Sequence, residues 1–337
     1  MRAAILNEPF KLEIEEYELR KPRRNEIIVN VNICGLCGTD YHIYRGESYS
    51  KPPLIPGHEF VGTIVEKGDQ VTGLQIGDRV AIDPNIYCGE CQFCRNGKIN
   101  FCENLKALGV SLNGGFAEYS LVPSSQAFLL SKEISFEAAA FAEPLSCCIR
   151  GIDQAEIKHG ETVAIVGGGT VGLLMLQLAK MSGASKVVVI EPVKEKRDMA
   201  IQIGADFIFD PNIHDMLNEI SELTTGGPDV VIECAGNSAA VNTAASLPKR
   251  GGRVIIFGLS SKKETVNINL QDFFLKELSI IGSLLNPFTF SRSVELLVGG
   301  KINTAGLNPV ISNLENLSSI LSQPRNSSVI KYHIKPN

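Results

Sequence analysis

The segment from Thr162 to Glu191 places the strictest limit on the fold. It begins with the apolar run Thr162–Val166, which reads as a buried strand, and the glycine-rich run Gly167–Gly172 follows at once. A helix-like pattern comes next, and then a second apolar run, Lys186–Ile190, that ends at Glu191. A strand, a glycine turn, a helix and a second strand in this order form a βαβ unit. The sequence therefore predicts a parallel sheet in this part of the chain.

The glycine run fits the G-x-G-x-x-G pattern of dinucleotide-binding turns. In that pattern Gly167 permits a tight turn, Gly169 lets the backbone approach a pyrophosphate, and Gly172 lets helix and strand pack closely. Thr170 and Val171 begin the helix, whose free N–H groups favour an anion. A plain glycine turn is the alternative, but the surrounding elements stand in the order that a dinucleotide site requires.

Glu191 bears on the choice of cofactor. It stands at the end of the second strand, where a carboxylate accepts hydrogen bonds from the adenosine ribose hydroxyls. A carboxylate there repels a ribose 2′-phosphate, so the sequence predicts NAD in preference to NADP. Lys194, Lys196 and Arg197 lie just beyond it. We interpret them as a solvated basic helix face, and the alternative is that they favour a phosphate. Arg197 is also a candidate cofactor-binding residue.

Four of the nine cysteines form the pattern C-x2-C-x2-C-x7-C, made by Cys88, Cys91, Cys94 and Cys102. The first residues contain no secretory signal pattern, so we expect a cytoplasmic protein with reduced thiols. Four thiolates on one loop can close a tetrahedral zinc site with no open position, which is the structural type. An iron–sulfur cluster is the alternative on spacing alone.

Two further polar clusters lie nearer the N-terminus and contain Cys37, Thr39 and His42, and then His58 and Glu59. Cysteine, histidine and glutamate are all zinc ligands, and three protein ligands with one exchangeable position make a catalytic site. Bound zinc polarises a substrate hydroxyl. Thr39 then offers a hydroxyl that relays the departing proton, and His42 can pass that proton to solvent. Taken singly, each of these residues also has an ordinary structural interpretation.

At this point the chain resembles the zinc-containing medium-chain alcohol dehydrogenases. Their signature G-H-E-x2-G-x5-G-x2-V is matched by Gly57, His58, Glu59, Gly62, Gly68 and Val71. The four-cysteine run, the glycine turn and the chain length resemble the same family. The run Phe141–Leu145 is similar to the E-P motif of its polyol branch. The resemblance implies that Cys37, His58 and Glu59 ligate a catalytic zinc, with Glu143 as fourth ligand or as holder of the zinc-bound water.

The resemblance also implies an α/β fold with two domains. A GroES-like, β-rich catalytic domain is expected over residues 1–145, and residues 285–337 are expected to return to it. A Rossmann domain with a doubly wound parallel sheet is expected over residues 146–284. Short apolar runs support the β-rich first part, namely Ile27–Ile33, Phe60–Val65 and Arg79–Ile82.

The predicted function is zinc-dependent oxidation of a secondary alcohol to a ketone, with hydride transfer to NAD. A polyol of the sorbitol, xylitol or arabinitol class, with or without a phosphate, is the leading substrate. L-threonine 3-dehydrogenase and 2,3-butanediol dehydrogenase are the alternatives within the family, and a zinc-bearing nucleotide-binding regulatory protein is the alternative outside it. Animal sorbitol dehydrogenases carry an Arg-Tyr pair where this chain has Leu285-Asn286, which argues against sorbitol itself.

Composition excludes other classes of function. The net charge of -5 gives no basic surface for nucleic acid. No apolar run reaches the roughly 18 residues that a membrane-spanning helix needs. We expect a small-molecule substrate, two zinc ions per chain (one catalytic, one structural), and a homodimer or homotetramer.

Overall fold

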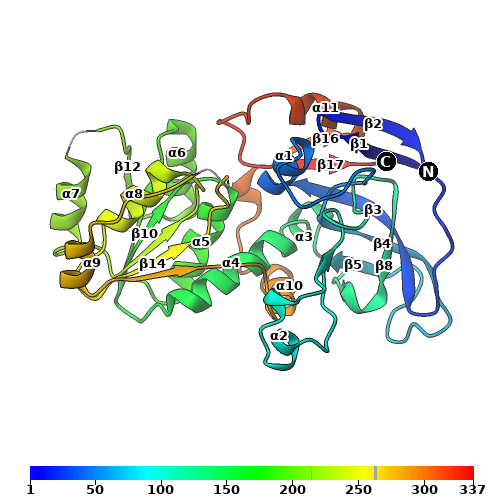
Figure 1. Ribbon diagram of the computed structural model, residues 1–337, viewed down its shortest axis with the longest axis horizontal. Coiled ribbons are helices and arrows are strands. Elements are labelled where there is room, and N and C mark those ends of the chain that lie inside the picture. The colour runs from blue at the N-terminus through cyan, green and yellow to red at the C-terminus, as the bar shows by residue number, and fades with distance from the viewer. Residues whose placement is uncertain (214, 262–263) are drawn as a thin grey trace. The chain divides into compact units, whose positions relative to one another are not determined.

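The structure is a computed structural model that describes residues 1–213, 215–261 and 264–337, and the chain divides into two units. One unit is made by Met1–Ser146 together with Pro287–Asn337, and the other by Cys147–Asn286. Each unit has its own sheet and its own apolar core (Figure 1). In the described part of the chain, no helix is long and apolar enough to cross a membrane.

The first unit is organised around strand β3, Glu26–Leu36, which is largely buried along its length. Strands β4 and β8 pair with it antiparallel, and β17 pairs with its C-terminal end. The sheet has the order β16-β17-β3-β4-β5-β9, with β8 also paired to β3. Its other strands are β4 (Glu59–Lys67), β5 (Arg79–Ile82), β8 (Tyr119–Pro123), β9 (Ala127–Leu129), β16 (Val310–Asn313) and β17 (Tyr332–Lys335).

Short strands and helices complete the first unit. Two further sheets pair β1 (Arg2–Glu8) with β2 (Lys11–Glu16) and β6 (Asn85–Ile86) with β7 (Lys106–Ala107). The helices that begin in this unit are α1 (Gly38–Tyr44), α2 (Gln92–Arg95), α3 (Phe136–Ala139), α4 (Ala142–Ala155), α10 (Phe290–Val298) and α11 (Leu314–Ser322). The 3-10 helices are η1 (Ile99–Phe101), η2 (Ser124–Gln126) and η3 (Ala305–Leu307).

The second unit contains six parallel strands in the order β12-β11-β10-β13-β14-β15. Successive strands run outward in both directions from the β10–β13 pair, which is the doubly wound order with a switch point between its two halves. The strands are β10 (Thr162–Val166), β11 (Lys186–Ile190), β12 (Phe207–Phe209), β13 (Val230–Glu233), β14 (Arg253–Ile256) and β15 (Ser279–Gly282).

Helices connect these strands and cover the sheet. They are α5 (Thr170–Met181), α6 (Lys194–Ile203), α7 (Met216–Leu223), α8 (Ser238–Ser246) and α9 (Leu270–Lys276). Met216 and Ile220 of α7 and Ala240 and Ala244 of α8 share one core with side chains of β10, β11, β13 and β14. These two helices therefore cover one face of the sheet.

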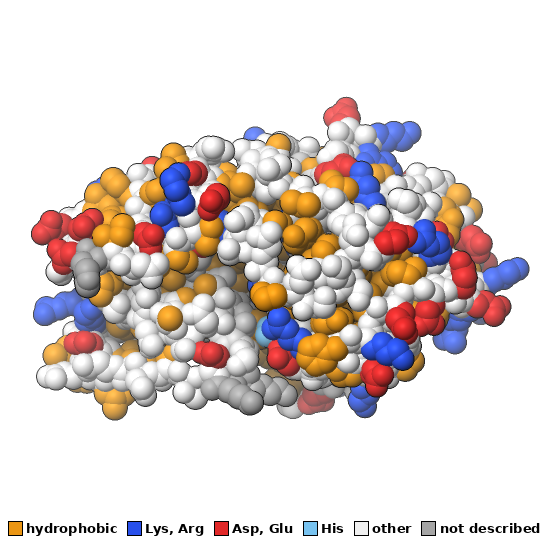
Figure 2. Space-filling model, turned by 90° about the horizontal axis from the view of Figure 1, so that it is seen from above, with side chains coloured by type: hydrophobic (Ala, Val, Ile, Leu, Met, Phe, Trp, Pro, Cys, Tyr) orange, Lys and Arg blue, Asp and Glu red, His pale blue; other side chains and the backbone are white. Residues whose placement is uncertain are grey.

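The fold class expected from the sequence is confirmed. The strands predicted at Thr162–Val166 and Lys186–Ile190 have these same bounds in the structure. The sequence analysis did not predict β12, α7 or α9. On the face shown in Figure 2, acidic and basic side chains are interspersed rather than gathered by sign.

The surroundings of Gly62 explain why the second glycine of the G-H-E-x2-G-x5-G-x2-V signature is required. It lies in β4 opposite Val31, where the pairing of β3 and β4 shifts register. A Cβ atom at this position would lie 2.1 Å from the carbonyl oxygen of Asn30. Backbone atoms cannot move away as a side-chain tip can, so only glycine fits this ladder.

We expect Gly62→Ala to lower the free energy of unfolding by about 3 kcal/mol, the upper part of the usual range for overpacking. Gly282→Ala is the matched control, because a Cβ there meets nothing within 4 Å and its backbone angles are ordinary. Urea unfolding of both variants measures the difference. Equal stability of the two variants would show that the β3–β4 ladder tolerates a side chain at position 62.

Candidate metal centres and cofactor site

Two neighbouring strands bring the candidate catalytic ligands together. Strands β3 and β4 pair with Gly35 opposite Glu59, and β3 ends directly before Cys37. Cys37 has extended backbone angles and stands at the N-cap of α1, so the chain turns there from strand into helix. Ligand atoms of Cys37, His58 and Glu59 all lie within 4.8 Å of one another. A sulfur, a nitrogen and a carboxylate oxygen that converge in this way fit a zinc ion with one exchangeable position.

A buried carboxylate orients the ring of His58. The Nδ1 atom of His58 lies 3.4 Å from Oδ1 of Asp40, and Oδ2 of Asp40 accepts a hydrogen bond from the Cys37 N–H at 2.8 Å. Carboxylates commonly stand behind metal-bound histidines in this manner, and Nε2 is then the nitrogen that faces the metal. The sequence analysis assigned no role to Asp40. Its position three residues after Cys37 on a helix was the only signal that could have identified it.

The electrostatic surroundings of His58 favour a positive charge. Burial lowers the pKa of His58, but Asp40 and Cys37 raise it, and the pKa lies well above its usual range. A metal cation held by Cys37, His58 and Glu59 meets the same electrostatic requirement, since it supplies positive charge among these buried anionic groups.

A lysine from the far end of the chain neutralises Glu59. The Nζ atom of Lys331, just before β17, donates to Oε2 of Glu59, 272 positions away in the sequence. The two side chains are only 4% and 1% exposed. A carboxylate buried to this degree needs a partner, so Lys331 and a metal ion would share the charge of Glu59. No local pattern in the sequence connects Lys331 with Glu59, and the pairing was not predicted.

Glu143 lies near these ligands in the first turn of α4. Burial raises its pKa to about 7, while His58 lowers the pKa and Glu59 raises it. Among the described residues, the group whose ligand atoms lie within mutual reach contains Cys37, His58 and Glu59 but not Glu143. Glu143 is therefore a buried acid beside the cluster.

Thr39 and His42 lie on helix α1 beside the candidate ligands. The hydroxyl oxygen of Thr39 is 3.7 Å from Sγ of Cys37. His42 is half-buried, and its Nδ1 lies 2.7 Å from the exposed carboxylate of Glu47. Residues three apart on a helix share a face. The arrangement places His42, which can exchange protons with solvent, on the same face of the helix as Thr39.

The other four cysteines converge around α2 and η1. Sγ of Cys88 lies 3.5 Å from Sγ of Cys102 and 4.0 Å from Sγ of Cys94. All four sulfur atoms, including that of Cys91, lie within 4.8 Å of one another. Zinc–sulfur bonds of about 2.3 Å in a tetrahedron separate the sulfurs by about 3.8 Å. The observed spacing therefore fits one zinc ion held by four sulfurs.

The acidities of these thiols also point to a cation. N–H groups of Glu90 and Cys91 lower the pKa of Cys88 to about 6. Burial and the neighbouring cysteines together raise the pKa of Cys94 to about 12, although the N–H of Gly89 lowers it. Four thiols this close together do not all ionise without a positive charge between them, and a metal ion supplies that charge.

The glycine turn joins β10 to α5 as its motif requires. Gly167 has a φ of 108°, which favours glycine. A Cβ atom on Gly172 would lie 1.8 Å from the carbonyl oxygen of Gly167, whereas a Cβ atom on Gly169 would meet nothing within 4 Å. Gly169 is the N-cap of α5, and Thr170 and Val171 form its first turn. A side chain at position 169 would therefore enter open space beside the N-terminus of α5, and helix N-termini favour a phosphate.

Glu191 and Arg197 shape the turn after β11. The Glu191 carboxylate accepts hydrogen bonds from the N–H groups of Gly168, at 2.6 Å, and Val193, at 2.9 Å. The Arg197 guanidinium donates to the carbonyl oxygen of Glu191 at 2.8 Å and lies 3.0 Å from Asp210. Arg197 thus holds the backbone that presents Glu191. Because Asp210 pairs with the Arg197 guanidinium, it would compete with a phosphate for that positive charge.

Comparison with known proteins agrees with this arrangement. Residues 23–132 match the family model described as the alcohol dehydrogenase GroES-like domain, and residues 170–298 match the model described as zinc-binding dehydrogenase. The chain belongs to the zinc-containing medium-chain alcohol dehydrogenase family. The family resemblance and the enzyme class, an alcohol-oxidising oxidoreductase, are thereby confirmed.

Individual relatives match nearly the whole chain. D-arabinitol dehydrogenase 1 of Uromyces fabae is 36% identical, over 100% of this chain and 97% of that protein. L-threonine 3-dehydrogenase of Pyrococcus horikoshii is 37% identical, over 90% of this chain and 88% of that protein. A zinc-binding dehydrogenase structure from Sinorhizobium meliloti, bound to NADP, superposes with a TM-score of 0.96 at 39% identity, covering 99% of each chain.

Two glycine variants separate the roles of the turn. We expect Gly169→Ala to keep the melting temperature within about 1 °C, because the Cβ enters open space, yet to weaken NADH binding about tenfold by obstructing the phosphate. Gly172→Ala should lower both the melting temperature and the NADH affinity, because its Cβ overlaps the Gly167 carbonyl. Thermal unfolding and titration of NADH fluorescence measure the two effects. Unchanged NADH affinity in Gly169→Ala would contradict the assignment.

Proposed function

We propose that the protein oxidises a secondary hydroxyl of a polyol to a ketone, with zinc at Cys37, His58 and Glu59 and with NAD as hydride acceptor. The observation that carries the proposal is the convergence of these three ligand types at the junction of β3, α1 and β4. The shared family and the likeness to D-arabinitol dehydrogenase 1 support the polyol class.

Threonine 3-dehydrogenase activity is the second candidate, because the threonine dehydrogenase of Pyrococcus horikoshii is equally similar to this chain. Both substrates carry a secondary hydroxyl, so the same metal ligands serve either reaction. A purely nucleotide-binding role is disfavoured by the complete set of candidate ligands.

In the proposed mechanism, bound zinc would polarise the substrate hydroxyl and bound nicotinamide would accept the hydride. Cys37, His58 and Glu59 would hold the metal, with Glu143 as a fourth ligand or as the group that holds water beside them. Asp40 would fix the tautomer and orientation of His58. Thr39 would accept the hydroxyl proton, and His42 with Glu47 would transfer that proton to solvent.

The four-cysteine cluster is proposed as a structural zinc site. Its ligands are all sulfur, so no position remains for a substrate. The cluster closes the loop from Cys88 to Cys102, which contains only the four-residue helix α2 and the three-residue helix η1. Such short elements gain most of their order from the metal.

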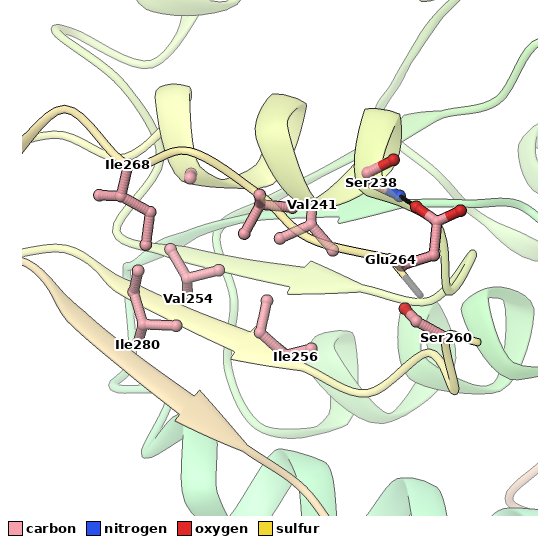
Figure 3. A pocket seen from close by; sticks show the side chains of 10 residues that line it. Ser238, Val241, Val254, Ile256, Ser260, Glu264, Ile268 and Ile280 are labelled. Atoms are coloured by element: carbon pink, nitrogen blue, oxygen red, sulfur yellow. Dashed lines mark hydrogen bonds between the residues drawn. The ribbon is translucent and has the colours of Figure 1, made fainter. Parts of the chain in front are cut away.

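Self-association is proposed at the edge of the second unit's sheet. Strand β15 is last in the sheet order, and its outer edge pairs with no other described strand. Leu270 and Phe274 of α9 are 79% and 80% exposed. A largely apolar cavity of about 240 Å³ lies nearby. Its lining includes Val241, Val254 and Ile280, whose side chains are shown in Figure 3. An open strand edge beside apolar surface suits pairing with a second copy of the chain.

Zinc content and turnover together test the two metal sites. We expect His58→Ala to lose one zinc and more than about a thousandfold in kcat, while NADH binding stays near the wild-type value. The glycine turn lies in the other unit, which is why binding should survive. Cys94→Ser should lose a different zinc and lower the melting temperature. Turnover that persists in a His58→Ala protein containing only the cysteine-bound zinc would refute the mechanism.

Substrate and cofactor preference are tested with a panel of xylitol, D-arabitol, sorbitol, D-arabitol 5-phosphate, L-threonine and 2,3-butanediol, each with NAD and NADP. We expect the highest kcat/KM with a polyol and NAD. Glu191→Ser should raise the NADP-to-NAD ratio of kcat/KM at least about tenfold, because it removes a charge that repels the 2′-phosphate.

Glu195→Ser is the matched control, since it removes an exposed carboxylate four residues further on. It should leave the cofactor ratio unchanged. A wild-type preference for NADP would overturn the cofactor assignment, and a preference for threonine or butanediol would overturn the substrate class.

A further inference from the structure

A carboxylate is buried at the end of a strand whose other side chains are apolar. Glu233 is the last residue of β13, follows Val230, Val231 and Ile232, and is 0% exposed. Burial raises the pKa of Glu233, although backbone N–H groups around its carboxylate lower it. No lysine, arginine or histidine among the described residues pairs with this carboxylate. A buried carboxylate without a cation is costly, so its hydrogen bonds must offset that cost.

The carboxylate of Glu233 joins two loops at the same edge of the sheet. Its Oε1 atom accepts hydrogen bonds from the N–H groups of Ala235 and Gly236, both at 2.7 Å, in the loop after β13. Its Oε2 atom accepts a hydrogen bond from the N–H group of Gly258, at 3.2 Å, in the loop after β14. A single side chain therefore supplies the acceptors for backbone donors of both loops.

These two loops are packed against each other and against the glycine turn. A Cβ atom on Gly258 would lie 2.2 Å from the backbone nitrogen of Gly236, so the two backbones pass with no room for a side chain between them. A Cβ atom on Gly167 would lie 3.2 Å from the backbone nitrogen of Ala235. The loops after β10, β13 and β14 therefore form one packed group at the carboxyl edge of the sheet.

The order of the strands assigns the two halves of a dinucleotide to different loops. In a doubly wound sheet the ligand lies across the carboxyl ends of the strands at the switch point, which here falls between β10 and β13. The glycine turn after β10 and Glu191 after β11 are the candidate sites for the pyrophosphate and the adenosine ribose. The nicotinamide nucleoside then belongs on the other side of the switch point, over the loops after β13 and β14.

We propose that Glu233 is a positioning residue that fixes the loops after β13 and β14 in the form that binds the nicotinamide nucleoside of the cofactor. Glu233 acts through the backbone and does not touch the cofactor, because its side chain is fully buried. Without the carboxylate, the N–H groups of Ala235, Gly236 and Gly258 lose their common acceptor, and the link between the two loops is lost. The inference rests on the dehydrogenase function proposed above.

The first test compares Glu233→Gln with Glu161→Gln in the full-length zinc-loaded protein. Glutamine keeps the size of the side chain but replaces one acceptor oxygen with an NH2 donor, so one of the two loops loses its acceptor. Glu161 is the matched control. It is a half-buried carboxylate just before β10, at the opposite end of the sheet, where it accepts a hydrogen bond from the N–H group of Lys158 and pairs with Arg253.

Calorimetric titrations with NADH and with ADP distinguish the two halves of the cofactor site, because ADP contains the adenosine and both phosphates but no nicotinamide nucleoside. We expect Glu233→Gln to weaken NADH binding about tenfold and to leave ADP affinity within about twofold of the wild-type value. Glu233→Asp should fall between, because it keeps both acceptor oxygens on a shorter side chain. Glu161→Gln should lower the melting temperature while both affinities stay within about twofold.

Hydrogen–deuterium exchange of the wild-type protein tests the placement without any substitution. NADH should slow amide exchange in peptides that cover residues 234–237 and 257–259 more than ADP does, because only NADH carries the nicotinamide nucleoside. Both ligands should slow exchange in the glycine turn, residues 167–172.

The proposal is overturned if NADH and ADP affinities fall by the same factor in Glu233→Gln, or if this variant binds NADH as tightly as Glu161→Gln does. Equal protection of the two loops by NADH and by ADP would also overturn it, and this measurement decides if neither Glu233 variant folds. If the protein binds NADH but oxidises no alcohol, the proposed function fails, while the binding and exchange measurements still decide the role of Glu233.

Discussion

The pairing of β3 with β4 is the constraint on which the rest of the active site depends. Its register sets Gly35 opposite Glu59, and Cys37 and His58 stand just beyond the two members of that pair. A slip by one residue would turn every side chain of one strand to the opposite face and separate the ligands. The same strand pairs with β17, so that Lys331 reaches Glu59 from the far end of the chain.

Burial of charge is the second organising principle, and it operates in both proposed metal sites. Asp40, Glu59 and Glu143 are all less than one tenth exposed. Buried carboxylates are costly unless a cation compensates them, and here Lys331 supplies positive charge beside Glu59. The four thiols of the cysteine cluster present the same problem in a smaller volume. In each site a zinc ion would supply positive charge that the protein's own side chains provide only in part.

Sequence reasoning succeeded where the signal is local. The β10–α5–β11 unit was predicted to within one residue, because apolar runs and a glycine turn follow one another without interruption. The candidate ligands stood out because cysteine, histidine and glutamate clustered in two short motifs. Their convergence within 4.8 Å of one another could not be derived from spacing, since it depends on strand register.

Sequence reasoning could not reach features that depend on tertiary contact. Strand β12 has only three residues, and α9 exposes its apolar side chains, so neither shows a clear periodic pattern. Lys331 looks like an ordinary basic residue, yet its side chain is only 4% exposed.

The central claim is that each chain holds two zinc ions in chemically different surroundings. Zinc K-edge X-ray absorption of the purified protein, combined with a metal count, tests this directly. The account predicts two zinc ions per chain, with cysteine sulfur as the dominant neighbour and a clear nitrogen and oxygen contribution from His58 and Glu59. One zinc per chain in an all-sulfur shell would contradict it, because the ligands at the end of β3 would then hold no metal.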